Sequence, residues 1–169
     1  MRSRFSPPVI FLSVLTHCIF SLADTVIEHG TVVINEVMFN PDGNENAREY
    51  VEILNLSGEP VSLEGWIVGD GTGFDLIVPF KEGVWNIPAD SFGLIMDPDY
   101  FEAGEPYSGI PGNIPLFTVI DKAIGSRGLS NSAAEPVYLI SDGGDTLSVV
   151  TYDTDCSPGH SESPSDGAA

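Results

Sequence analysis

The sequence predicts an all-β fold, either a sandwich or a barrel of short strands. Apolar, β-branched runs alternate with turn sequences about every 8–12 residues, a spacing typical of these architectures. The 169 residues include 18 glycines and 13 prolines, which favour short strands over long helices. No long segment keeps its apolar residues at helical spacing. The length suits one domain with a tail, and a hydrophobic content of 42% suffices for one core.

The first 23 residues have the pattern of a secretory signal peptide. Arg2 and Arg4 give the positive start, residues 9–20 are mostly apolar, and Ser21-Leu22-Ala23 places small residues before the expected cleavage point. An apolar run of about 12 residues is too short to span a bilayer. We therefore expect export to the cell envelope or the medium, and no membrane span in the mature chain. Residues 24–30 are expected to be a short lead.

The mature chain is strongly acidic. Loss of Arg2 and Arg4 with the signal leaves four basic residues against 25 acidic ones, a formal charge of −21. Such a surface repels phosphate backbones and anionic lipids, so direct nucleic-acid binding is not expected. A solvated acidic surface explains the charge most simply.

The strand candidates follow one another along the chain. Within residues 49–55, strict alternation directs Glu49 and Val51 to one face and Tyr50 and Glu52 to the other. The turn Asp142-Gly-Gly-Asp145 predicts a hairpin between its flanking strands. The expected strands cover residues 31–38, 49–55, 61–63, 65–68, 74–80, 91–96, 116–120, 137–140 and 146–152.

Residues 97–115 are predicted to form a long surface loop. This segment is rich in Gly, Pro, Asp and Glu, and it carries Tyr100, Phe101 and Tyr107. Loops of this length usually need packing of their own, so we expect these rings to fold the loop onto the sandwich. An aromatic patch that binds carbohydrate or protein is the alternative. Residues 125–131 are expected to form another loop.

The strand motifs resemble a known family. Four stretches, taken in this order, resemble the lamin tail domain of secreted bacterial proteins. They are Val33-Ile34-Asn35-Glu36-Val37, Asn40-Pro41, residues 49–55 and Val61-Ser62-Leu63-Glu64-Gly65-Trp66. The resemblance implies an immunoglobulin-like β-sandwich over residues 31–156. It also implies no catalytic residues, and an accessory role in binding or tethering.

Three carboxylates, those of Glu36, Glu49 and Glu52, are candidates for a catalytic group. Acid–base catalysis needs two carboxyl groups facing one cleft. Because Glu49 and Glu52 lie on opposite faces of their strand, Glu36 can pair with only one of them. The sequence shows no nucleophile with a partner base, so we expect no enzyme activity.

Asn35, Glu36 and Trp66 are expected to have structural roles. Asn35 and Glu36 form a polar pair among apolar neighbours, and such side chains often cap a sheet end or bind backbone groups of a loop. Trp66, between Gly65 and Ile67, is expected to fill space between the two sheets.

A calcium site is the sharper alternative reading of the acidic turns. Asp42, Asn44 and Asn46 alternate oxygen-bearing side chains, as calcium loops do, although the pattern is not an EF-hand. No His/Cys cluster supports zinc, and we expect no cofactor other than this calcium. Cys156 has no intrachain partner once Cys18 leaves with the signal.

These observations predict a non-catalytic, exported binding or adhesion module whose partner is a protein or an extracellular polymer. The alternative is the accessory domain of an extracellular nuclease or phosphoesterase whose catalytic part lies outside this chain. Residues 157–169 are expected to be a flexible tail of a truncated form. The last sheet edge would then be less well covered than in complete relatives, and an exposed edge strand favours self-association.

Overall fold

The computed structural model describes residues 27–28, 31–41, 47–104, 107 and 109–152. Within them the chain forms short strands and one short helix. In chain order these are β1 (Ile27–Glu28), β2 (Val32–Met38), β3 (Tyr50–Asn55), β4 (Val61–Ser62), β5 (Ile67–Gly69), β6 (Phe74–Pro79), β7 (Asn86–Ile87), β8 (Ser91–Met96), α1 (Asp99–Glu102), β9 (Leu116–Val119), β10 (Pro136–Ile140) and β11 (Thr146–Thr151).

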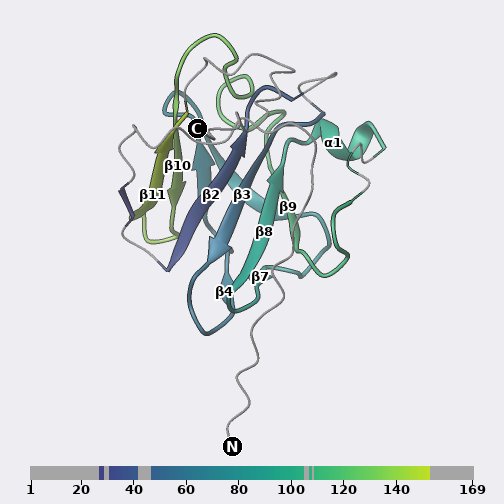
Figure 1. The fold of residues 1–169 in the computed structure, drawn as a ribbon, viewed down its shortest axis with the longest axis vertical. Coiled ribbons are helices and arrows are strands. Elements are labelled where there is room, and N and C mark those ends of the chain that lie inside the picture. Colours follow the sequence, from purple (N-terminus) through teal and green to yellow (C-terminus); the bar gives the residue numbers. More distant parts are fainter. Residues whose placement is uncertain (1–26, 29–30, 42–46, 105–106, 108, 153–169) are drawn as a thin grey trace, which may run out of the picture.

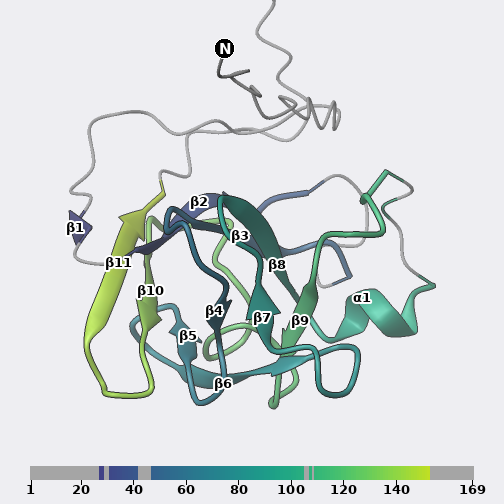
Figure 2. The ribbon, with the colours of Figure 1, turned by 90° about the horizontal axis from the view of Figure 1, so that it is seen from below.

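Nine of these strands form one continuous sheet that folds over itself. Their order is β1-β11-β10-β5-β6-β9-β8-β3-β2. β6 lies at the bend, because residues 74–76 pair with β5 and residues 77–79 pair with β9. One layer therefore contains β2, β3 and β8, and the other contains β5, β6 and β10 (Figures 1 and 2). This arrangement confirms the predicted all-β class.

Alternation along each strand builds the core between the layers. Val51 and Ile53 in β3 are fully buried, and Ile34 and Val37 in β2 lie in the same core. The alternation of inward and outward side chains along β2 shifts by one residue, because the register with β3 shifts between Ile34 and Glu36. This bulge allows β2 to keep apolar side chains inward on both sides of the shift.

A second apolar cluster covers the outer side of β3 and β8. Tyr50 and Met96 on these strands pack with Tyr100, and Phe101 and Tyr107 lie against the same cluster. The Tyr107 hydroxyl donates a hydrogen bond of 2.7 Å to the Arg48 carbonyl. The aromatic residues thus hold the described part of this loop segment onto the sandwich, as expected. The segment also contains helix α1, which its composition did not predict.

The structure corrects the expected edge of the sheet. β1 lies within the segment expected to be a lead, and Ile27 and Glu28 pair with Val149 and Ser148 of β11. β11 is therefore not the edge strand, because β10 pairs with it on one side and β1 pairs with Ser148 and Val149 on the other. Residues 157–169 and Cys156 lie outside the described residues.

Two short strands that follow each other in the chain belong to different sheets. Residues 61–62 and 67–69 do not pair with each other: β4 pairs with β7, while β5 lies between β6 and β10. β7 has only two residues, and no sequence pattern predicts it. Among the described residues, no helix has the length and apolar character needed to cross a membrane.

Candidate functional site

The three carboxylates considered for catalysis separate in the structure. Glu36 and Glu52 stand opposite each other on β2 and β3, whereas Glu49 is 2% exposed and accepts a hydrogen bond from the Leu129 backbone N–H at 3.0 Å. The Glu36 and Glu52 side chains are therefore partly buried on the outer side of the sheet, whereas the Glu49 carboxylate binds the backbone of the loop that contains Leu129. No described contact gives these carboxylates a shared cleft.

Asn35 and Glu36 form hydrogen bonds with side chains of the neighbouring strand β3. The Asn35 amide donates to Glu52 Oε1 at 2.6 Å, and the Tyr50 hydroxyl donates to Glu36 Oε1 at 2.6 Å. Burial raises the pKa of Glu52, although the hydrogen bond from Asn35 opposes this effect. Burial and the Glu36 carboxylate raise the pKa of Tyr50 far above its usual value, so the hydroxyl keeps its proton. These contacts join β2 to β3 across the bulge.

Trp66 lies where the sequence predicts a core residue. Its side chain is 8% exposed and packs with Leu63 and Val68 in the core between the layers. Its backbone carbonyl also accepts a hydrogen bond of 2.9 Å from the Ile77 N–H of β6.

The calcium candidates Asp42, Asn44 and Asn46 lie outside the described residues. Among the residues that are described, no group of three or more His, Cys, Asp or Glu side chains is placed to hold a metal ion. The calcium site therefore stays a prediction.

Two other acidic residues bind the loop of residues 121–131. Asp70 Oδ1 accepts hydrogen bonds from the Thr72 and Gly73 N–H groups and the Thr72 hydroxyl, and its Oδ2 accepts one from the Ser126 N–H at 2.9 Å. Asp75 Oδ2 accepts one from the Gly125 N–H at 2.6 Å. Both carboxylates are buried, with 3% and 6% exposed.

The environments of these two carboxylates shift their pKa values in opposite directions. Burial alone would raise the pKa of Asp70, but the hydrogen bonds from Ser126, Gly73 and Thr72 outweigh it and hold the pKa below its usual value. Burial raises the pKa of Asp75, and its single backbone hydrogen bond only partly offsets this. With Glu49, these groups satisfy the backbone of a loop, which is a structural task.

The outer side of the β5–β6–β10 layer carries a row of apolar side chains. In the strand register, Leu76 stands opposite Ile67, and Ile67 stands opposite Ile140. The Ile120 N–H donates to the Leu76 carbonyl at 3.1 Å and extends this row by one residue. We call the row Ile120–Leu76–Ile67–Ile140, together with Phe74 and Tyr138 beside it, the apolar face.

Three side chains of the apolar face are exposed, and Ile67, Tyr138 and Ile140 are half-buried. Ile120 is 70% exposed, Phe74 52% and Leu76 38%. The Phe74 ring lies over Gly69, where an added Cβ would be 2.6 Å from the Phe74 Cδ1 atom. It also meets the Tyr138 ring, with centroids 5.8 Å apart. No described helix or strand covers this side of β5 and β6 (Figure 2).

Charge is absent from the apolar face but present at its ends. Strands β5, β6, β9, β10 and β11 contain one charged residue, Asp75, and it points into the protein. The row of four ends near Asp121 and Lys122 on one side and near Asp142 and Asp145 on the other, all four exposed. Large apolar patches with polar rims mark sites where proteins bind other molecules.

A family model described as Lamin Tail Domain matches residues 25–154. The chain belongs to the lamin tail domain family. The immunoglobulin-like fold of this family agrees with the two-layered sheet, and the match includes β1, which precedes the motifs that suggested the family. A search of the curated proteins found no match.

Sequence reasoning on this lamin tail domain missed the apolar face. The signal is present in residues 74–80, where the outward residues Phe74, Leu76 and Phe80 are as apolar as the inward Ile77. A strand with one solvated face should instead alternate apolar with polar residues. The buried role of Asp70 and Asp75 was also missed, since each binds residues about 50 positions later in the chain.

Proposed function

We propose that this lamin tail domain is a non-catalytic, exported module that binds another protein through its apolar face. The observation that carries the proposal is the row Ile120–Leu76–Ile67–Ile140, which runs across neighbouring strands without a charged member. Burying one such side chain contributes about 1.5–3 kcal/mol. A preformed flat sheet also binds without the cost of ordering a loop.

The rim of the apolar face indicates the kind of partner. Three of its four charged side chains are acidic, and the whole chain has a formal net charge of −19. A partner with an apolar centre and a basic rim fits this surface. A second copy fits poorly, because it would bring acidic rims together.

The signal-peptide pattern of residues 1–23 supports export. The family match supports the non-catalytic role, because the lamin tail domain is typically a non-catalytic immunoglobulin-like fold.

The proposal is tested by comparing two substitutions at exposed apolar positions. Ile120→Asp places a charge in the apolar face, whereas Leu56→Asp places one at a side chain that is 53% exposed outside it. The chain without residues 1–23 is immobilised and used to capture extracellular proteins of the organism that produces it. Binding of each purified partner is then measured by calorimetry.

Ile120→Asp should weaken binding at least about tenfold, because it removes apolar burial and buries a charge. Leu56→Asp should leave the affinity within about twofold. Both variants should melt like the wild type, since exposed substitutions change stability by about 0.5 kcal/mol or less. A partner that binds Ile120→Asp as tightly as the wild type would refute the proposed use of the face.

A further inference from the structure

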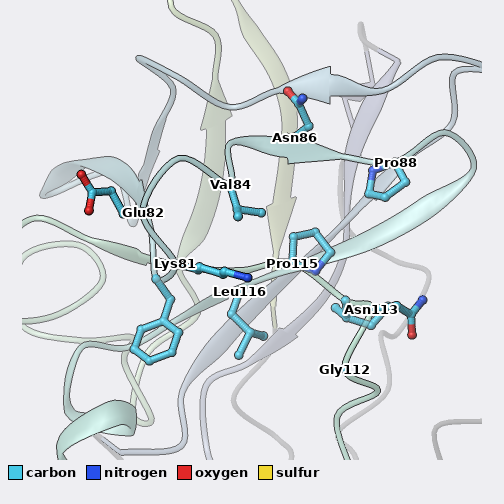
Figure 3. A pocket seen from close by; sticks show the side chains of 11 residues that line it. Lys81, Glu82, Val84, Asn86, Pro88, Gly112, Asn113, Pro115 and Leu116 are labelled. Atoms are coloured by element: carbon cyan, nitrogen blue, oxygen red, sulfur yellow. The ribbon is translucent and has the colours of Figure 1, made fainter.

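A groove lies beside the apolar face, between the segment that follows β6 and the start of β9. Its volume is about 670 Å³, within the range of ligand-binding sites. Its walls are mainly apolar (Figure 3), and they are formed by Phe80, Val84, Pro88, Ile114, Pro115 and Leu116. The Phe80 ring stacks on Phe101 with centroids 3.9 Å apart, so this wall is held in place.

One lysine and one acidic residue, Lys81 and Glu82, belong to the lining of this groove. In Figure 3 the Lys81 side chain crosses the view between Val84 and Leu116, while the Glu82 carboxylate is directed away from it. Lys81 forms no ion pair or side-chain hydrogen bond with the residues that the structure describes. The Lys81 ammonium group is exposed beside the apolar walls, so on this chain with 25 acidic residues it is available to a ligand.

We propose that this groove binds the C-terminal end of a partner polypeptide, with Lys81 holding the terminal carboxylate and the apolar walls holding the last side chains. The site is separate from the apolar face and does not depend on the function proposed for it. A charge-assisted hydrogen bond from an ammonium group to a carboxylate is about twice as strong as a neutral one.

The charge of the protein limits the anion to a single carboxylate. Phosphorylated or polyanionic ligands would meet the repulsion of a chain with a formal net charge of −19, and one lysine cannot offset several negative charges. A carboxylate at the end of an apolar chain carries the least charge that still uses Lys81.

The polar groups of the lining favour a peptide over a fatty acid. Asn86 and Asn113 line the groove, and neither side chain has a hydrogen bond with the described residues. Side-chain amides offer both donors and acceptors, which match the N–H and C=O groups of an extended peptide. Both amides are exposed, so a fatty acid would leave them bound to water, whereas a peptide backbone can bind them directly.

The test uses an N-acetylated pentapeptide, Gly-Val-Pro-Val-Leu, with either a free C-terminal carboxylate or a C-terminal amide. Octanoate is the third probe. Each is titrated into the ¹⁵N-labelled chain without residues 1–23, and amide shifts are followed by NMR. We expect the free acid to shift signals of residues 80–88 and 112–116 and to bind about tenfold more tightly than the amide form.

Variants separate the role of Lys81 from a general effect of charge. Lys81→Met should reduce binding of the acid to the level of the amide form, and Lys81→Arg should restore most of it. Lys122→Met removes a lysine outside the groove and should change nothing. Ile120→Asp should bind the peptide like the wild type, which distinguishes this site from the apolar face.

Three results would overturn the proposal. Equal binding of the free-acid and amide forms would show that Lys81 does not hold the terminal carboxylate. Octanoate binding as tightly as the peptide acid would assign the groove to a fatty acid. Unchanged signals of residues 80–88 and 112–116 at millimolar peptide would mean that the groove binds no peptide terminus.

Discussion

Replacing Asp70 with asparagine tests whether the buried carboxylates hold the fold together. In Asp70→Asn, the remaining amide oxygen can keep the hydrogen bonds from Thr72 and Gly73. The amide nitrogen then faces the Ser126 N–H, which donates to Oδ2 at 2.9 Å in the wild type. Two donors therefore meet in a buried site.

The expected loss of stability follows from these contacts. Loss of one charge-assisted hydrogen bond and burial of an unsatisfied donor together cost about 2–4 kcal/mol. A loss of this size lowers the melting temperature by about 10 °C in a domain of this length. Urea unfolding followed by tryptophan fluorescence measures it, and the m-value should stay unchanged.

Asp142→Asn is the matched control, because it removes the same charge from an exposed turn. It should change stability by about 0.5 kcal/mol or less. The pKa of folded Asp70 is lowered, so its contribution is present above about pH 4 and is lost as the pH falls through the folded pKa. The difference between wild type and Asp70→Asn should shrink at about pH 3. A variant as stable as Asp142→Asn would refute this role of Asp70.

Three further substitutions follow from buried positions. Trp66→Ala should cost about 3–5 kcal/mol in urea unfolding, and a cost below about 1 kcal/mol would contradict a core position. Burial raises the pKa of Asp97 to about 6, so the stability of the wild type relative to Asp97→Asn should fall as the pH rises from about 4 to about 6, and a pH-independent difference in melting temperature would contradict this. Gly125 and Gly144 both have positive φ, but a Cβ at Gly125 would collide with the Asp70 carboxylate whereas one at Gly144 meets open space. Gly125→Ala should therefore be less stable than Gly144→Ala by about 2 kcal/mol, and equal stability would refute the contact.

Local patterns predicted the strands, but not their arrangement. β8 was predicted at residues 91–96, and the hairpin of β10 and β11 followed from its Gly-Gly turn. The parallel pairing of β8 with β9 and the position of β5 beside β10 join segments far apart in the chain, and no local pattern encodes them. β1 and β7, with two residues each, are too short to show alternation.

The candidate site was harder to predict than the core. Alternation separates inward from outward positions, so the burial of Val51 and Ile53 could be expected. An apolar residue at an outward position looks like core when only the sequence is known, because both faces of a fully buried strand are apolar. Leu76 and Ile120 became visible as surface residues only when the structure showed their exposure.

The central claim is that the apolar face contacts a partner protein. Methyl NMR of the labelled chain, titrated with the captured partner, measures this contact residue by residue. Signals of Ile67, Leu76, Ile120 and Ile140 should shift or broaden together, while the Leu56 signals, from an exposed side chain outside the face, should stay in place. Perturbation of Leu56 with unchanged signals from the four residues of the row would contradict the claim.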